Sequence, residues 1–479
     1  MKATLTEPSR QTPVLGEYEV VVLGGGPAGI AAAVAAARSG RSTLLVERYG
    51  FLGGMGTAAG VTNFCGLHAN VHGDIRQVVH GVADDLLQRI DRLGGLNEPH
   101  NLFGKTVAQA YDTAAYKIAA DDLMLSAGVK VLFHAWAAGA AMESPRRIKA
   151  LLVETKSGRR AVVGRSFIDC SGDGDLAAWA GAPYEKGDGQ GNMLYPSTMF
   201  RLNGIDPVRA GRAWEVIPRL MMEAEAAGRY KFPRKTPIVR PQKNGIEWRV
   251  NLTQLANAQG NAMDGTDADE LSDAEMLGRR QIASVAAFLK EVPGFENSYI
   301  VDIAPQVGIR ETRRVRGRYM LTEADVLECA SFDDTVGVNG WPLELHLKGD
   351  VEFRWPKIPE SRGFNHLPYR MTVPLAGAKP LQTGGGASGG RTKPAGEPNT
   401  MDNLWVAGRC ASMSHEAQSA ARVTGACFVM GQAAGTAAGL ALEAGCEAAA
   451  VDVAALQSRL ESNGAYLGLK LVAPRRRSS

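Results

Sequence analysis

Two hydrophobic runs near the start of the chain define its first predicted elements. Tyr18–Leu23 is largely apolar and is followed by glycines, which is typical of a strand buried on both faces. Ala28–Ser39 consists mainly of alanine and other small residues and ends at Gly40, as a helix packed against a sheet does. Thr43–Val46 reads as a second short strand. Together they predict a βαβ unit, and therefore a parallel sheet with a right-handed crossover.

Further along the chain, helical and extended patterns alternate. We predict strands at Val129–Phe133, Ile148–Glu154, Ala161–Asp169 and Asn403–Ala407, and helices at 107–127, 207–228, 270–291 and 424–443. A turn over 156–159 should join two of these strands into a hairpin. The segment Gly377–Pro398 is rich in Gly, Pro, Lys and Thr and has little to bury, so we expect a mobile loop or lid there.

A glycine-rich turn joins the first strand to the first helix. Gly24–Gly29 (GGGPAG) fits GxGxxG, and Glu47 ends the second strand. In this arrangement the first glycine permits the tight turn, the second lets a pyrophosphate approach the backbone, and the third lets helix and strand pack closely. A carboxylate at Glu47 would bind the adenosine ribose hydroxyls and repel a 2′-phosphate. The turn therefore predicts a dinucleotide site that disfavours NADP.

A second glycine-rich loop, Gly50–Thr57 (GFLGGMGT), follows Glu47 directly. It suits a cofactor longer than NAD, whose pyrophosphate and ribityl chain continue past the first loop. At this point the sequence resembles the FAD-dependent oxidoreductases of the glutathione-reductase-like flavoprotein superfamily. Within that superfamily it is most similar to the bacterial family called simply FAD-dependent oxidoreductase.

The resemblance continues through most of the chain. It is carried by Asp169–Asp175 (DCSGDGD), Pro305–Tyr319 (PQVGIRETRRVRGRY), Leu367–Arg370 (LPYR) with Val373-Pro374, Asn403–Arg422, and Gly431–Gly435 (GQAAG). It implies an α/β fold with a Rossmann-like FAD-binding domain, built on a parallel sheet, and an inserted mixed α+β substrate domain. We place the FAD-binding domain at 17–180 plus 400–470 and the substrate or cap domain at 181–399, with loose termini at 1–16 and 473–479.

The resemblance also implies which residues hold FAD. They are Gly24, Gly26, Pro27, Ala28, Gly29, Glu47, Arg48, Gly53, Gly54, Met55, Asp173, Gly408 and Arg409. Ala137 is a candidate backbone partner for the adenine. In related folds the last helix aims its N-terminus at the flavin pyrimidine, which here brings in the backbone N–H groups of Thr424, Gly425 and Ala426. We expect non-covalent FAD, because residues 53–60 contain no linking histidine; Cys65 and His68, just beyond, are the alternative attachment points.

Flavin chemistry leaves the protein to orient the substrate and to move a proton. The candidate acid or base residues are His415, His346 and His366, which lie in segments similar to the family's flavin-proximal motifs. Arg310, Arg313, Arg370 and Arg422 are candidates to bind a substrate carboxylate, with buried salt bridges as the alternative. Tyr369 is a candidate hydrogen-bond partner for a substrate oxygen.

Three functions compete at this stage. The first is a dehydrogenase or oxidase that transfers a hydride between flavin and a small organic substrate at a CH–OH, a CH–NH or an activated C=C. The electron acceptor could then be oxygen, a quinone or a redox protein. The second is a monooxygenase that uses external NAD(P)H and oxygen, although Gly408-Arg409 stands where aromatic hydroxylases of the superfamily have Gly-Asp. The third is a non-catalytic or RNA-modifying flavoprotein.

Composition narrows the partners. The chain has 53 Lys and Arg against 50 Asp and Glu, a net charge of +3, so we expect no nucleic-acid partner. No apolar segment is long enough to predict a membrane span. The six cysteines have no CxxC spacing and HExxH is absent, so we expect no metal site. Reduced thiols favour a cytoplasmic location, and oligomer formation is left open.

Overall fold

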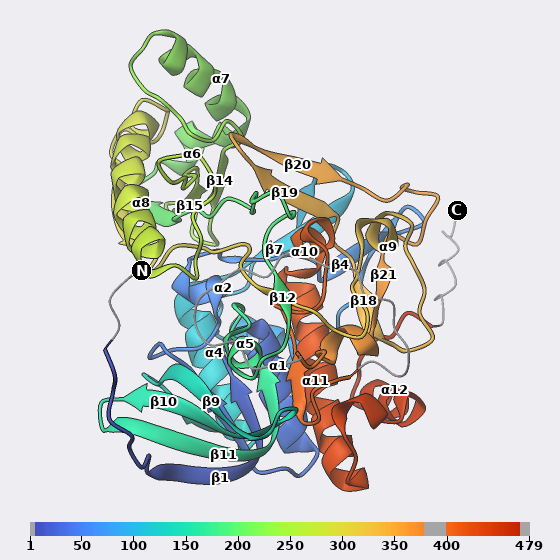
Figure 1. The fold of residues 1–479 in the computed structure, drawn as a ribbon. Coiled ribbons are helices and arrows are strands. Elements are labelled where there is room, and N and C mark those ends of the chain that lie inside the picture. The colour runs from blue at the N-terminus through green and yellow to red at the C-terminus, as the bar shows by residue number, and fades with distance from the viewer. Residues whose placement is uncertain (1–4, 378–398, 470–479) are drawn as a thin grey trace, which may run out of the picture.

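The fold is described from a computed structural model and covers residues 5–377 and 399–469. Figure 1 shows a large sheet with its helices at one end of the molecule and a smaller helical and sheet assembly at the other. Of the predicted lid Gly377–Pro398, all residues after Gly377 lie outside the described residues, as does the predicted tail 473–479. The prediction of a loose terminus over 1–16 is wrong for its last residues, because Val14–Gly16 already belong to the first strand.

The central sheet has seven strands. They are β1 (Val14–Leu23), β2 (Thr43–Val46), β8 (Lys130–Leu132), β9 (Trp136–Ser144), β10 (Arg147–Thr155), β11 (Gly158–Asp169) and β22 (Leu404–Val406). The order is β8-β2-β1-β11-β10-β9, and β22 pairs with the end of β11. The pairs β1/β2, β2/β8, β1/β11 and β11/β22 are parallel, whereas β10 and β9 are antiparallel. The predicted α/β class with a parallel sheet is confirmed, and so is the hairpin of β10 with β11.

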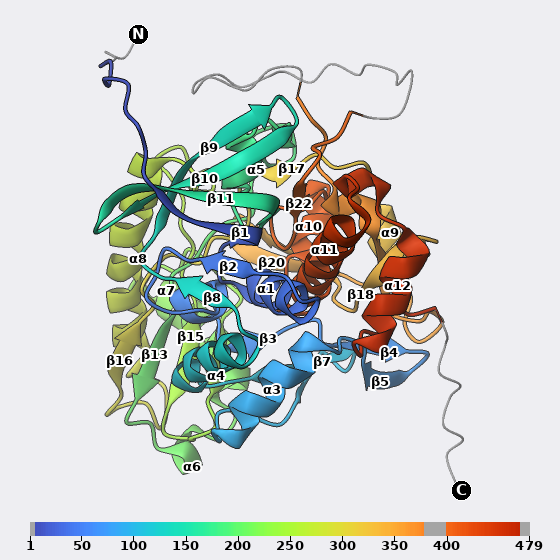
Figure 2. The same ribbon diagram turned by 90° about the horizontal axis from the view of Figure 1, so that it is seen from below.

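Two small-residue helices pack against each other beside this sheet. The helix α1 (Pro27–Arg38) lies between β1 and β2 in the chain, and α11 (Thr424–Ala444) follows β22. Figure 2 shows the two helices side by side, although nearly 400 residues of sequence separate them. A Cβ at Gly435 would overlap the backbone carbonyl oxygen of Ala32 on α1. Small side chains therefore let the C-terminal segment close over the N-terminal unit.

We expect Gly435→Ala to destabilise the fold even though alanine is the better helix former. Helix propensity alone would favour alanine by about 1 kcal/mol. The new methyl group must instead push α1 and α11 apart, and overpacking of this kind costs about 1–3 kcal/mol. Urea unfolding should show a lower free energy of unfolding. In the same helix, exposed Ala444→Ser should change it by less than about 0.5 kcal/mol. An unchanged or raised stability for Gly435→Ala would contradict the packing.

The helix α4 (Thr113–Ser126) is shorter than the predicted 107–127. Residues Thr106–Ala110 instead form strand β7, which pairs with β3 (Asn63–Phe64) and β6 (His100–Leu102). The Asp112 side chain accepts a hydrogen bond from the N–H of Ala115 and so begins the helix. The prediction was wrong because the alternation of buried and partly exposed residues over 106–110, which is typical of a strand, was read as the start of the helix.

A separate core lies in the smaller assembly. Its sheet has the order β14-β15-β13-β16 and consists of β13 (Phe200–Asn203), β14 (Ile238–Pro241), β15 (Trp248–Asn251) and β16 (Tyr299–Ile303). The buried apolar residues of this core fall within 200–295. The predicted helix 207–228 is broken at Gly211 into α6 (Pro207–Ala210) and α7 (Ala213–Ala226). The predicted helix 270–291 is α8 (Ala268–Leu289), which begins after the Asp267 cap.

The chain between 314 and 376 returns to the large core, where most of its buried apolar side chains pack. The remaining elements are α2 (Met55–Ala58), β4 (His68–Val71), β5 (Asp74–Gln77), α3 (Val82–Arg92), α5 (Asp175–Trp179), β12 (Tyr184–Glu185), β17 (Arg314–Val315), α9 (Glu323–Leu327), β18 (Thr335–Asn339), β19 (Leu343–Leu347), β20 (Asp350–Arg354), β21 (Asn365–Pro368), α10 (His415–Ala421) and α12 (Val453–Ser462). Short 3₁₀ turns occur at Tyr369–Thr372 and Ala448–Ala450.

The helix α11 is long and apolar enough to cross a membrane by length and composition. However, 83% of its most apolar window is buried inside the protein. Burial of this kind is what the core helix of a folded domain shows, so the helix gives no sign of a membrane span.

Candidate active site

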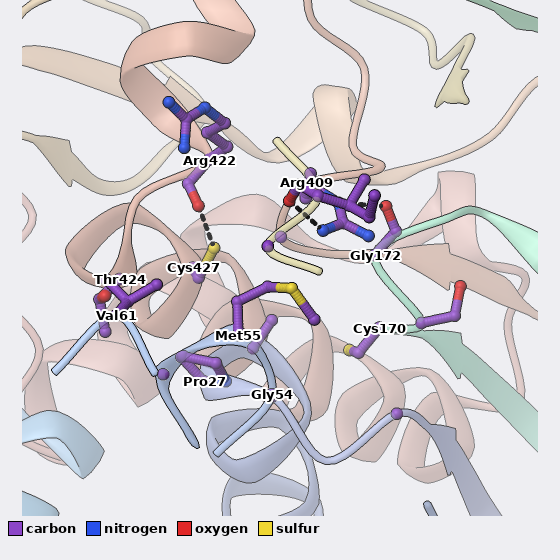
Figure 3. A pocket seen from close by; sticks show the side chains of 18 of the residues that line it. Pro27, Gly54, Met55, Val61, Cys170, Gly172, Arg409, Arg422, Thr424 and Cys427 are labelled. Atoms are coloured by element: carbon purple, nitrogen blue, oxygen red, sulfur yellow. Dashed lines mark hydrogen bonds between the residues drawn. The ribbon is translucent and has the colours of Figure 1, made fainter. Parts of the chain in front are cut away.

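One cavity begins at the glycine-rich turn and runs to the smaller assembly. Figure 3 shows it from close by, with Pro27, Gly54 and Met55 along one wall and Arg409 beside Gly172 across from them. Twelve of the predicted FAD-binding residues line it: Gly24, Gly26, Pro27, Ala28, Glu47, Arg48, Gly54, Met55, Ala137, Gly408, Arg409 and Thr424. Pro27 and Ala28 lie on α1, Met55 on α2, Ala137 on β9 and Thr424 on α11, and the others lie in the loops that follow β1, β2 and β22, so the fold gathers distant parts of the chain at one end of the sheet.

Five other predicted FAD-binding residues lie behind this wall: Gly29, Gly53, Asp173, Gly425 and Ala426. A Cβ at Gly29 would overlap the carbonyl oxygen of Gly24, as expected where helix and turn pack closely. The N–H of Gly425 donates to the Cys65 carbonyl at 2.9 Å. Because that N–H already has a partner, the other backbone N–H groups at the start of α11 would have to make any contact with a flavin.

The turn has room for a phosphate group. A Cβ at Gly26 would meet only the Gly54 Cα within 4 Å, at 3.7 Å, and would otherwise project into the cavity. Glu47 braces the turn, because its carboxylate accepts hydrogen bonds from the N–H of Gly25 at 2.6 Å and of Tyr49 at 2.9 Å. Burial raises the pKa of Glu47, and these two bonds oppose the rise. The residues present therefore fit the pyrophosphate and ribose of a dinucleotide.

Arg409 is held rigidly at the side of the cavity. Its guanidinium donates to the Gly172 carbonyl at 2.8 Å, to the Ile309 carbonyl at 2.6 Å and to the Asp173 carboxylate at 2.6 Å. Asp173 also accepts from the Thr312 hydroxyl at 2.9 Å. The predicted pair Asp173 and Arg409 is thus brought together as a buried ion pair that shapes the wall.

A glutamate and a histidine form a hydrogen-bonded pair at the far end of the cavity. His346 Nε2 lies 3.1 Å from Glu344 Oε1, and the Trp341 indole donates to Glu344 Oε2 at 2.8 Å. Burial alone would raise the pKa of Glu344, but the His346 bond, the Arg422 charge and the Trp341 bond lower it to about 2. Burial and the nearby Arg310 hold the pKa of His346 well below 6.5. At neutral pH the pair is therefore a carboxylate and a neutral imidazole.

The tautomer of His346 follows from this pair. A neutral ring that donates from Nε2 to a carboxylate carries its lone pair on Nδ1. None of the described residues makes a hydrogen bond to that Nδ1. His346 lines the cavity and therefore offers a proton acceptor to a molecule bound there.

Arginines surround the same end of the cavity. Arg310 is buried and donates to the Tyr195 carbonyl at 2.6 Å and the Ser197 hydroxyl at 2.9 Å. Arg249 is 3% exposed and donates to the Thr62 carbonyl, but its Nε has no hydrogen-bond partner among the described residues. Arg422 also lacks such partners at Nε and Nη2. In Figure 3 its side chain lies on the opposite side of Cys427 from Pro27.

The other predicted catalytic residues lie outside the cavity lining. His366 Nδ1 accepts from the Phe332 N–H at 3.2 Å, and Tyr369 donates to the Ala448 carbonyl at 2.6 Å while accepting from Trp405. His415 Nδ1 lies 2.8 Å from a Glu311 oxygen, without hydrogen-bond geometry. Their polar atoms face protein groups, and their catalytic roles stay predictions.

Two of the candidate carboxylate-binding arginines are likewise placed away from the cavity. Arg313 donates to Asp175 at 2.8 Å, and half-exposed Arg370 lies 5.0 Å from the Tyr319 ring centre. Of the four arginines predicted for this role, Arg310 and Arg422 are those that line it.

Sequence reasoning missed Glu344 and Arg249. Glu344 stands two residues before His346 on β19, and strand alternation puts both on one face, so that spacing could have revealed the pair. Arg249 interrupts the buried strand β15 (WRVN), and a charge inside a buried strand is itself a signal of function.

A parallel sheet with a glycine turn, a braced acidic residue and a continuous cavity defines a dinucleotide-dependent enzyme of α/β fold. A comparison with family profiles identifies the group: the profile described as FAD dependent oxidoreductase matches residues 19–384 and 397–460. The chain belongs to this family. It is an oxidoreductase whose cofactor is FAD, which this family typically holds without a covalent bond.

Solved structures with related folds are distant in sequence. A geranylgeranyl bacteriochlorophyll reductase-like protein from Thermoplasma acidophilum is 14% identical, with 93% of this chain and 83% of that chain covered and a TM-score of 0.44. The anhydrotetracycline hydroxylase OxyS from Streptomyces rimosus is 11% identical over 93% of this chain and 65% of that chain, with a TM-score of 0.40. No curated protein matches the chain. At these scores the two structures do not indicate which reaction this chain catalyses.

Proposed function

We propose that the protein is a dehydrogenase or oxidase that removes a hydride from a C–H bond beside oxygen or nitrogen in a small organic substrate. The observation that carries the proposal is the Glu344–His346 pair at the end of the cavity. FAD, when bound, supplies the two-electron acceptor for the hydride. The reaction also needs a base that takes the O–H or N–H proton of the substrate. The neutral imidazole of His346, with its free nitrogen, can act as this base.

The roles of the two residues differ. His346 Nδ1 takes the proton as the substrate's C–O or C–N single bond becomes a double bond. Glu344 acts as a positioning residue: it fixes the tautomer and stabilises the imidazolium that forms, because its low pKa keeps it charged throughout the working pH range. Burial, together with the charge of Arg310, which is held by Tyr195 and Ser197, keeps the pKa of His346 low and the free imidazole neutral between turnovers.

The test is anaerobic reduction of the holoenzyme. Alcohols, amines and hydroxy acids are added in turn, and the flavin absorbance near its visible maximum is followed without NAD(P)H. We expect at least one compound class to bleach the flavin in a single turnover. For the alternative, a monooxygenase, we expect instead that only NAD(P)H reduces the flavin. Oxygen should then reoxidise the reduced flavin in a reaction that depends on the substrate.

The proposal includes the finer classification and organisation. The β1-α1-β2 unit and the return of β22 and α11 support membership of the glutathione-reductase-like superfamily. The separate core within 200–295 supports an inserted cap on the substrate side, with a narrower span than 181–399. All six cysteines are free, which supports a cytoplasmic location.

A further inference from the structure

We propose that the substrate is an organic carboxylate whose anionic group binds between Arg249 and Arg422, with its reacting carbon toward His346. This inference rests on the proposed function and names its substrate class. It starts from an imbalance of charge. The charged residues lining the far end of the cavity, within the described part of the chain, are Arg249, Arg310, Arg422 and Glu344.

The excess of positive charge is confined to the far end of the cavity. At the cofactor end the cavity is lined by Glu47, Arg48, Asp175 and Arg409, two charges of each sign. At the far end three guanidinium groups face one carboxylate, and Glu344 is already engaged by His346 and Trp341. Behind them, Arg234 is 1% exposed and adds a further positive charge. Unbalanced buried charge is costly, so an anionic ligand would be stabilised strongly here.

Two of the arginines also have hydrogen-bonding capacity left over. Arg249 Nε and two Arg422 nitrogens are enclosed without a partner among the described residues, whereas Arg249 Nη2 and Arg422 Nη1 are also unpaired but not enclosed, so a ligand in the cavity can reach them. Both lie close to the Cys65 thiol, since their charges oppose the burial that raises its pKa to about 12. Arg310 is different, because each of its Nη atoms already donates a hydrogen bond, to the Tyr195 carbonyl and to the Ser197 hydroxyl. A planar carboxylate matches guanidinium donors of this kind better than a neutral group does.

The sites of carboxylate and base are on different elements. Arg249 lies on β15 of the smaller assembly, Arg422 follows α10, and His346 lies on β19. A molecule held by its carboxylate would therefore bridge the two parts of the protein and present its next carbons to His346. The substrate class that follows is a hydroxy or amino acid rather than a simple alcohol or amine.

The experiment compares matched probes on the FAD-loaded enzyme. Benzoate, benzamide, benzylamine and inorganic phosphate are titrated separately, and binding is read from the change in flavin absorbance. We expect benzoate to bind at least about tenfold more tightly than benzamide and benzylamine. Phosphate distinguishes a general anion site from a carboxylate site, and binding of phosphate in preference to benzoate would overturn the carboxylate assignment.

Substitutions locate the effect. Arg249→Gln should lower the affinity for benzoate by about 30-fold or more and keep the affinity for benzamide within about threefold of the native value. The reason is that the loss of a buried charge affects binding of the anion alone. Arg249→Lys should retain part of the preference for benzoate over benzamide. If Arg249→Gln does not fold, Arg422→Gln gives the same test. The control is Arg240→Gln: Arg240 pairs with Arg249 across β14 and β15 but does not line the cavity, so benzoate affinity should stay within about threefold.

The two proposals can fail separately. Tight benzoate binding without flavin reduction by any alcohol, amine or hydroxy acid would reject the proposed reaction and keep the carboxylate site. Reduction by uncharged alcohols, with equal affinity for benzoate and benzamide, would reject the carboxylate site and keep the reaction. An Arg249→Gln enzyme with an altered flavin reduction potential but an unchanged preference for benzoate over benzamide would show that this arginine serves the cofactor instead, and would also reject the site.

Discussion

The Gly26→Val variant should purify as a folded protein that has lost its FAD. The position accepts a side chain without strain in the backbone, because its φ is −72° and its Cβ would meet no atom closer than the Gly54 Cα at 3.7 Å. The added branches would fill the space that the pyrophosphate needs against the start of α1. We expect flavin occupancy below about a tenth of the native value, since a blocked phosphate site removes the cofactor's main anchor. The flavin-to-protein absorbance ratio measures it.

Two controls separate loss of binding from loss of fold. Gly26→Ala adds one methyl group and should retain more FAD than Gly26→Val. Ala226→Val, exposed at the end of α7, adds similar bulk far from the turn and should leave occupancy unchanged. Circular dichroism of the Gly26→Val protein should match that of native apoprotein. A yellow Gly26→Val enzyme at full occupancy would show that FAD does not lie against this turn.

The His346→Gln variant should bind FAD normally and lose most of its activity. Glutamine keeps a polar side chain of similar reach but cannot take a proton, and removal of a general base lowers the rate by about 10²–10⁴-fold. The loss should appear in kcat more than in KM, because the proton moves in the chemical step and not in binding. Steady-state kinetics with a substrate found in the bleaching assay measures the effect.

The pH profile distinguishes a base from a structural histidine. The pKa of His346 lies below 6.5, and the base must be neutral to act. Activity should therefore be complete above that pKa and fall as the pH drops through it, so the acidic limb of kcat/KM should lie below pH 6.5. His346→Gln should abolish this limb, whereas His72→Asn, on the surface, should preserve it. A His346→Gln enzyme with more than about a tenth of native kcat and an unchanged limb would exclude the assigned role.

The glycine-rich turn at the cofactor end of the site was readable from the chain because its parts are contiguous. A buried strand, Gly24–Gly29 and a helix of small residues form one local unit, and Glu47 follows on the next strand. Burial patterns and turn chemistry act over a few residues, so the sequence shows them directly. The same locality explains the boundary errors: alternation at Thr106–Ala110 was read as part of a helix, and Gly211 was read through.

The substrate end could be assembled only in three dimensions. His366 and His415 were candidate acids or bases beside His346, and Tyr369 was a candidate hydrogen-bond partner for the substrate, but the fold turns these three toward protein partners. The charge of Glu344 and the unpaired nitrogen of Arg249 depend on burial, which the fold decides.

The amino-acid sequence by itself therefore determined the class of fold and the turn that receives a dinucleotide, because those depend on short-range backbone geometry, and its resemblance to a flavoprotein family implied FAD. The tertiary structure decided which histidine faces the cavity and which arginines remain unpaired there. Such properties depend on the dielectric environment and on neighbours from β15, β19 and α10, which are brought together only by long-range packing.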